Sequence, residues 1–126
     1  DRTRSQPSHT ELAEGYRLTR PLLDWFMNHY FSGEPADAND PYSSPLHADD
    51  LGGLPPALVI SAGYDPLRDE DIAYYEQLRA HGNDAEHLHY PGMIHGFINM
   101  PGVLDAAHKC LEACGMRLQR VFAQPA

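Results

Sequence analysis

The most constraining feature of this 126-residue sequence is a short, unbroken run of apolar residues that follows two prolines. Residues 57–61 read Ala-Leu-Val-Ile-Ser. An apolar run of this length without alternation is typical of a β-strand that is buried on both faces, as in parallel sheets. Such a strand needs further strands beside it and a covering layer on each face.

The residues after this run alternate between helix and strand patterns. Residues 63–65 predict a turn, and the acidic residues 69–71 open a helix, because negative side chains are favoured in a first turn. Gly82 lies where a left-handed cap would end that helix. Residues 86–90 alternate and predict a second strand, followed by a loop over residues 91–101. Apolar residues then step by three and four through a last helix: Leu104, Ala107, Leu111, Cys114, Leu118 and Val121.

The first half of the chain predicts less regular structure. Residues 1–10 are polar and read as a loop or a frayed end. A helix begins near Thr19, with Pro21 in its first turn. Its apolar residues share one face: Leu22, Leu23, Phe26, Met27 and Tyr30. Residues 32–56 are rich in Gly, Pro, Ser, Asn and Asp, which predicts a long functional or wrapping loop with at most a short turn of helix.

The order strand, helix, strand, helix predicts an α/β fold with parallel strands. The length is that of one ordinary domain, yet two strands do not make a stable sheet by themselves. We therefore expect residues 1–126 to be the C-terminal part of a larger α/β domain that is incomplete without its N-terminal part.

Charge and composition exclude several classes of partner. The net charge of -9 argues against nucleic acid and against anionic membranes, because both are bound by clustered Lys and Arg. The longest apolar run, residues 54–60, is far too short to span a bilayer. Cys110 and Cys114 are four residues apart in a predicted helix and read as buried thiols, so no oxidising compartment is implied and a cytoplasmic location is expected.

Two chemically useful residues follow the two predicted strands. Asp65 comes after the first and His95 after the second. The carboxyl ends of parallel neighbours lie at the same edge of a sheet, about 4.8 Å apart, so these side chains can meet there. An Asp followed by a His in this order fits the acid and the base of a Ser-Asp-His triad. The alternatives are a simple turn or helix cap for Asp65 and a solvated loop residue for His95.

At these residues the sequence resembles the hormone-sensitive-lipase-like family of α/β-hydrolases, which includes bacterial carboxylesterases. The resemblance extends from about Leu18 to Phe122. It is carried by Ser44-Pro45-Leu46, Leu54-Pro55-Pro56-Ala57, Ala62-Gly63-Tyr64-Asp65-Pro66-Leu67-Arg68-Asp69-Glu70 and Tyr90-Pro91-Gly92-Met93-Ile94-His95-Gly96-Phe97.

The resemblance implies that Asp65 is the triad acid and His95 the triad base, with no cofactor and no metal. It assigns residues 18–35 to a lid-contributing segment and residues 54–122 to the catalytic core. Five residues are candidates for the substrate pocket, with plain core packing as the alternative for the helix residues: Leu23, Phe26, Met27, Ile94 and Phe97.

Two motifs of that family do not occur in the sequence. These are Gly-Asp-Ser-Ala-Gly, which carries the nucleophilic serine, and His-Gly-Gly, which forms the oxyanion hole. Ser43, Ser44 and Ser61 lack the elbow sequence, so none is assigned as nucleophile. We expect a portion of a serine carboxylesterase for short to medium acyl esters, inactive alone. The alternative is a non-catalytic module for ligand binding or for homodimerisation through the last strand and helix.

Two other constellations compete with this interpretation. His81, His87 and His89 form a cluster in which two side chains share a strand face, so a divalent metal site is conceivable, although no carboxylate or cysteine stands at a recognised ligand spacing. A catalytic role for Cys110 or Cys114 is disfavoured, because burial in a helix suits an inert thiol.

Overall fold

The computed structural model describes residues 1–31 and 37–123; residues 32–36 of the predicted long loop and of the predicted lid segment lie outside it. The elements, in chain order, are the helices α1 (Ser8–Glu11) and α2 (Arg20–Tyr30), the 3-10 turn η1 (Pro45–His47), strand β1 (Ala57–Tyr64), helix α3 (Arg68–Ala80), strand β2 (Ala85–Ile94), the 3-10 turn η2 (Phe97–Asn99) and helix α4 (Asp105–Phe122). The predicted order of strands and helices is confirmed.

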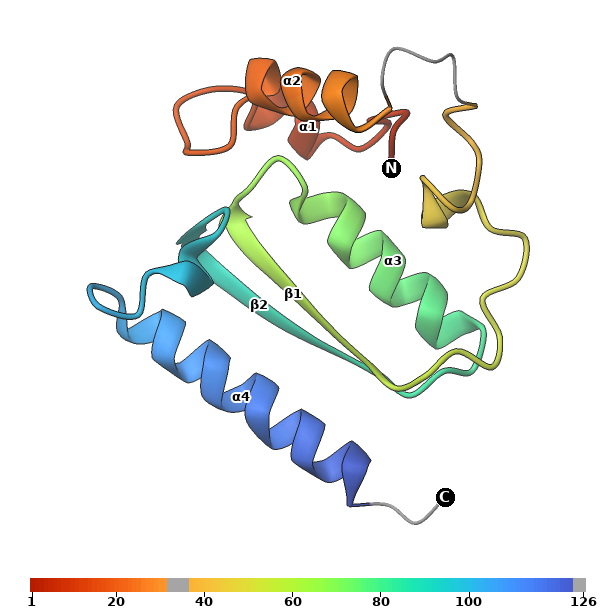
Figure 1. Ribbon diagram of the computed structural model, residues 1–126, viewed down its shortest axis with the longest axis vertical. Coiled ribbons are helices and arrows are strands. Elements are labelled where there is room, and N and C mark those ends of the chain that lie inside the picture. The colour runs from red at the N-terminus through yellow and green to blue at the C-terminus, as the bar shows by residue number, and fades with distance from the viewer. Residues whose placement is uncertain (32–36, 124–126) are drawn as a thin grey trace.

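The two strands are parallel, and they lie between two helices. Ala57 pairs with Ala85 at one end and Tyr64 with Ile94 at the other. In Figure 1, α3 and α4 flank the strand pair on opposite sides. The expected α/β class is therefore confirmed, with a sheet of two strands in the described part of the chain.

Alternation along β1 divides the interior into two small cores. Val59 packs towards α3, in a cluster with Leu51, Leu78 and Ala85. Ile60 and Ala62 belong to the opposite cluster, which includes Phe97, Ala107 and Cys110. Because successive side chains of a strand point to opposite faces, this one strand contributes to both cores.

Both strands are longer than predicted. The predicted turn at residues 63–65 and the predicted loop from residue 91 begin too early, because β1 continues to Tyr64 and β2 to Ile94. The pairing passes from Ala62–Tyr90 to Tyr64–Ile94, which places the single Gly63 opposite residues 91–93. A Cβ on Gly63 would lie 2.0 Å from the Pro91 carbonyl oxygen. Glycine therefore allows the two backbones to approach closely at this shift in register. In the sequence, Gly63 and Pro91-Gly92 look like the ends of the two strands.

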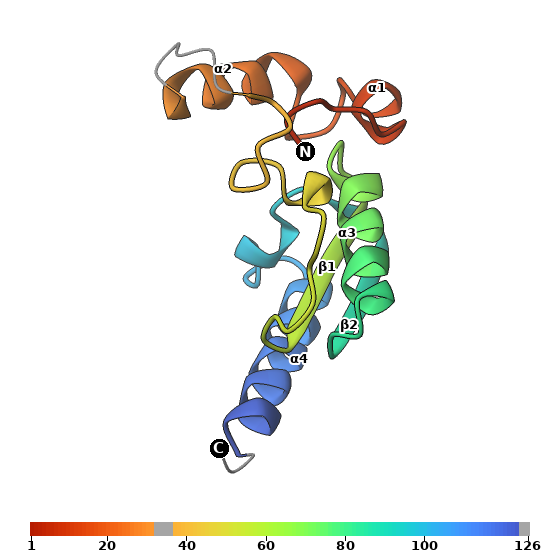
Figure 2. The ribbon, with the colours of Figure 1, turned by 90° about the vertical axis from the view of Figure 1, so that its right-hand side faces the viewer.

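The N-terminal residues are more ordered than predicted. Residues 1–10 were expected to be a loop or a frayed end, but α1 begins within them and both Ser8 and His9 are buried. Helix α2 is confirmed, beginning one residue after Thr19. Both helices lie across the end of the sheet where the strands finish (Figure 2).

The last helix is confirmed, but its apolar stripe is only half covered. Ala107 and Cys110 are buried, whereas Leu111 is 46% exposed and Leu118 is 55% exposed. Cys114, Leu118 and Val121 line an open groove of about 420 Å³ with Pro55, Pro56, Leu58 and Ile60 of the β1 side. The prediction that the first strand is buried on both faces is therefore wrong for residues 57–60 in the described part of the chain, where they are only partly buried beside this groove.

Within the described residues, no helix combines the length and the apolar character that crossing a membrane requires.

Candidate active site

Asp65 is fixed where β1 gives way to α3. Its carboxylate Oδ1 accepts a hydrogen bond from the backbone N–H of Leu67 at 2.9 Å, and its carbonyl accepts from Arg68 at 3.0 Å. The residue is 5% exposed. The first carboxylate oxygen thus forms a local turn at the start of the helix, which leaves Oδ2 free to bind a partner from another element.

That partner is His95, which directly follows β2. Its Nδ1–H donates to Asp65 Oδ2 at 2.8 Å. A carboxylate only accepts, so this contact assigns the proton to Nδ1 and leaves Nε2 as the acceptor. The hydrogen bond with Asp65 raises the pKa of His95, against the opposing effect of its partial burial. The next residue, Gly96, has φ +71, which a glycine adopts without steric cost.

A cavity of about 350 Å³ opens beside this pair. Asp65, Asp71 and His95 supply its charged lining. The rest of the lining is mainly apolar: Ile60, Ala62, Leu67, Phe97 and Ile98, with Gly96 and Asn99. A second cavity of about 200 Å³ joins His95 to α2 and the residues before it, lined by Arg17, Leu18, Leu22, Phe26, Gly96 and Asn99.

The predicted pocket residues lie in different places. Phe97 lines the first of these cavities, and Phe26 lines the second. Met27 lines another cavity, shared with Phe26 and Tyr42, whose lining does not include His95. Leu23 is the one buried residue of α2, and Ile94 pairs with Tyr64 at the end of β2. Two of the five candidates, Phe26 and Phe97, thus line cavities that His95 also lines, and the binding role of all five stays a prediction.

Several residues beside His95 were missed by the sequence reasoning. Leu18 and Leu22 belong to the same apolar stretch as the chosen candidates, and the helical stripe could have pointed to Leu22. Arg17 donates to the Gly96 carbonyl at 3.3 Å. No sequence signal connects Arg17 with a loop 79 residues away.

The three histidines of the alternative metal site, His81, His87 and His89, do not gather around one point. Ser61 Oγ lies 2.8 Å from His87 Nε2 and 2.8 Å from His89 Nδ1, and burial lowers the pKa of His87. His81 instead bonds the Gln77 carbonyl at the end of α3. Among the described residues, no group of three or more His, Cys, Asp and Glu side chains could hold a metal ion.

The two cysteines differ in exposure. Cys110 is buried and Cys114 is partly buried, and both are free thiols. Burial raises the pKa of the Cys110 thiol. A raised pKa disfavours the thiolate, which is the reactive form.

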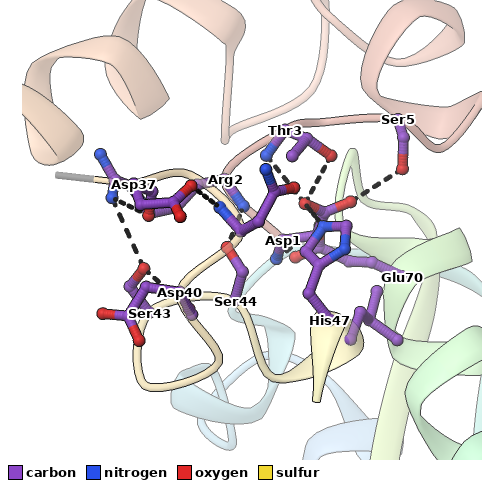
Figure 3. A network of polar contacts seen from close by, with 12 residues as sticks. Asp1, Arg2, Thr3, Ser5, Asp37, Asp40, Ser43, Ser44, His47 and Glu70 are labelled. Carbon is purple, nitrogen blue, oxygen red and sulfur yellow. Dashed lines mark hydrogen bonds and ion pairs between the residues drawn. The ribbon is translucent and has the colours of Figure 1, made fainter. Parts of the chain in front are cut away.

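A polar network fastens the N-terminal residues to the long loop before β1 (Figure 3). The Arg2 N–H donates to Ser44 Oγ at 2.9 Å, and His47 Nε2 lies 3.2 Å from Asp1 Oδ1. On α3, Glu70 Oε2 lies 2.8 Å from His9 Nε2. These contacts tie the chain before α2 to the loop and to the helix that follows Asp65.

A buried aspartate bonded to a histidine, each on the loop after its own parallel strand, is the arrangement by which α/β-hydrolases hold the acid and the base of a triad. A family model described as the alpha/beta hydrolase fold matches residues 1–99. The chain belongs to this family, and its resemblance to the hormone-sensitive-lipase-like esterases is confirmed.

The similar proteins are ester hydrolases. The chain is 40% identical over 111 residues to the carboxylic ester hydrolase LipN of Mycobacterium tuberculosis, covering 85% of this chain and 30% of that protein. It is 33% identical over 115 residues to the ethyl acetate hydrolase of Pseudomonas putida, covering 91% of this chain and 36% of that protein. The chain thus spans about a third of the length of the curated relatives it matches.

Solved structures agree with this assignment. A thermostable carboxylesterase from a metagenomic library superposes with a TM-score of 0.87 at 39% identity, over 95% of this chain and 40% of that one. A hyperthermophilic esterase of the archaeon Pyrobaculum calidifontis superposes with a TM-score of 0.81 at 40% identity, over 92% of this chain and 39% of that one.

Proposed function

We propose that the protein is a serine carboxylesterase, in which Asp65 is the triad acid and His95 the triad base. The observation that carries this proposal is the 2.8 Å contact between His95 Nδ1 and Asp65 Oδ2. It is supported by the 40% sequence identity between the chain and a carboxylic ester hydrolase over 85% of this chain. The nucleophilic serine and the oxyanion hole come from residues outside these 126, because the sequence holds neither motif.

The mechanism follows from the direction of the hydrogen bond. With Nδ1–H held by Asp65, His95 Nε2 takes the proton of the serine hydroxyl as its oxygen attacks the ester carbonyl. The imidazolium that forms is stabilised by the Asp65 carboxylate, in keeping with the raised pKa of His95. His95 then returns the proton to the leaving alcohol, and water hydrolyses the acyl-enzyme by the same route.

The substrates we propose are neutral esters with short to medium acyl chains. The cavity that joins His95 to the α2 region is walled by the apolar side chains of Leu18, Leu22 and Phe26. Such walls favour an alkyl or aryl group over a charged one. The names of two relatives, an ethyl acetate hydrolase and an arylesterase, describe esters of this kind.

We further propose that the open groove between β1 and α4 is covered in the full-length protein by the remainder of the α/β-hydrolase sheet. Its lining is largely apolar and belongs to both the strand and the helix: Pro55, Pro56, Leu58, Ile60, Cys114, Leu118, Val121 and Phe122, with Arg117. Apolar surface of this kind is normally covered.

The test uses the full-length protein and a p-nitrophenyl ester of a short acyl chain. His95→Ala should abolish base catalysis, while Asp65→Asn should leave KM nearly unchanged and lower kcat by roughly four orders of magnitude, because the imidazole loses its tautomer. His108→Ala, which removes an exposed histidine of α4, is the matched control and should retain full activity. Unchanged turnover in either active-site variant contradicts the assignment.

A further inference from the structure

A third carboxylate, that of Asp71, lies at the candidate site and has no role in the mechanism above. Asp71 is in the first turn of α3, where its backbone N–H donates to the Leu67 carbonyl. It lines the 350 Å³ cavity with Asp65 and His95. It also lines a smaller cavity of about 150 Å³ with Asp1, Glu70 and Tyr74. Asp71 therefore lines both the cavity of the Asp-His pair and the cavity beside Asp1 and Glu70.

The Asp71 carboxylate is not neutralised by a close partner. Within residues 1–31 and 37–123, no side chain forms a hydrogen bond or an ion pair with it. The groups whose charges act on it are Asp65, Glu70, His95 and the Asp1 amino group. Burial, followed by repulsion from Asp65 and Glu70, raises the pKa of Asp71 to about 7. Its charge therefore changes in the pH range where a histidine base works.

The charge of Asp71 acts on His95 in turn. The groups that shift the pKa of His95 are Asp65 and Asp71, which raise it, and Arg17, which lowers it. Asp65 acts mainly through its hydrogen bond, whereas Asp71 acts through space across the shared cavity. A second negative charge near an imidazole favours its protonated form.

We propose that Asp71 is a positioning residue of the esterase reaction, whose carboxylate supports the imidazolium of His95 when the serine proton is transferred. This proposal rests on the proposed function, because it needs His95 to be the base. In it, Asp65 fixes the tautomer and Asp71 adds charge without touching the ring. The first turn of α3 thus carries part of the site's electrostatics.

Three variants of the full-length protein test the proposal. Asp71→Asn removes the charge and nearly keeps the shape, while Asp71→Glu keeps the charge. Glu76→Gln is the matched control, because Glu76 is an exposed acid on the same helix and does not line the cavity. The readouts are the pH profile of kcat/KM for a neutral p-nitrophenyl ester and the pKa of His95 from NMR titration of its ring signals.

Asp71→Asn should shift the acidic limb of the profile and the pKa of His95 to lower pH, together with a loss in kcat at the plateau. Asp71→Glu should restore both towards the wild type, and Glu76→Gln should change neither. A pKa of His95 that stays unchanged in Asp71→Asn overturns the proposal even if the esterase is active. A shift in the NMR titration without any ester turnover would instead refute the esterase function and with it the role of Asp71 in that reaction.

A measurement on the wild type covers the case in which Asp71→Asn does not fold. The side-chain carboxyl signal of Asp71 should titrate near pH 7, and the ring signals of His95 should respond to the same transition. Titration of Asp71 in the ordinary acidic range of an aspartate, with no response of His95, overturns the proposal.

Discussion

At the scale of single residues, Gly63 determines how closely β1 and β2 approach just before Asp65 and His95. Replacing Gly63 with Ala would place a Cβ 2.0 Å from the Pro91 carbonyl oxygen and 2.6 Å from its carbon. Both atoms belong to backbone, so the strands must separate, and we expect the free energy of unfolding to fall by about 1–3 kcal/mol or more. Urea denaturation measures this loss.

Gly92→Ala is the matched control on the opposite strand. A Cβ at Gly92 meets nothing within 4 Å. Its substitution should change stability by only a few tenths of a kcal/mol, roughly the range of exposed positions. Equal effects of the two substitutions would mean that the close contact at Gly63 is relieved without cost.

Asp71 also makes stability depend on pH, with a definite sign. Its pKa in the folded protein, about 7, lies above the ordinary value of 3.8, so the folded state holds this proton more tightly than the unfolded state. The resulting stability is fully present below pH 3.8 and is lost as the pH rises through 7. Asp71→Asn should therefore be more stable than the wild type at pH 8, with the difference shrinking towards pH 4 in urea titrations. A constant difference across this range contradicts the assignment.

The pairing of Asp65 with His95 could be predicted from sequence because parallel strands bring their carboxyl ends to one edge. The place of Asp71 beside this pair could not be predicted from sequence. In the sequence, Asp71 is one of three adjacent acids that favour the start of a helix. Which of the three faces the cavity depends on the rotation of α3 against the sheet, and that rotation is set by contacts between distant segments.

At the scale of elements, Ser8 connects α1 to the segment that carries Asp65. Its hydroxyl donates to the Pro66 carbonyl at 2.7 Å and accepts from the Asp69 N–H at 3.2 Å. Its own N–H donates to Asp69 Oδ2 at 2.9 Å. Ser8 is fully buried, so Ser8→Ala leaves the Pro66 carbonyl and the Asp69 N–H without the hydroxyl, while the bond from the Ser8 N–H remains; we expect a cost of about 1–2 kcal/mol.

Thermal unfolding of the full-length protein checks this cost against Thr10→Ala, which removes an exposed hydroxyl from the same helix. The Ser8 variant should also lose turnover, because Pro66 follows Asp65 directly and Asp69 lies in the first turn of the helix after it. If both variants unfold at the wild-type temperature, α1 does not support the site.

The elements themselves were predictable to the extent that local patterns define them. The cores of both strands, α3 and α4 follow from runs and periodicity, and Gly82 does adopt the left-handed conformation at φ +81. The short α1 could not be predicted, because its order depends on partners about 60 residues away. The burial of Arg117 was missed too: it lies within the apolar face of α4 and pairs with Asp84 and Glu86.

At the scale of the whole molecule, the net charge bears on which substrates can bind, and the open groove bears on how complete the fold is. The net charge of -9 and the acidic groups around His95 disfavour anionic substrates. The open groove and the half-covered face of α4 agree with the expectation that two strands are too few for a stable sheet. The extent of the groove could not be predicted, because a periodic apolar stripe does not reveal how much of it a neighbour covers.

The 126-residue chain by itself should hydrolyse no ester at an enzymatic rate. His95 can accept a proton, but without a positioned serine and an oxyanion hole there is no nucleophile to activate and no site for the negative charge of the intermediate. Exposed imidazoles of the chain still hydrolyse activated esters slowly, so a bare rate with p-nitrophenyl butyrate decides nothing. The decisive comparison is the wild-type chain against its His95→Ala variant, whose rates should be nearly equal, because His95 is only one of several imidazoles that react in this way. A wild-type chain that is more than tenfold faster, with saturation by the ester, would mean that a serine within residues 1–126 completes the site.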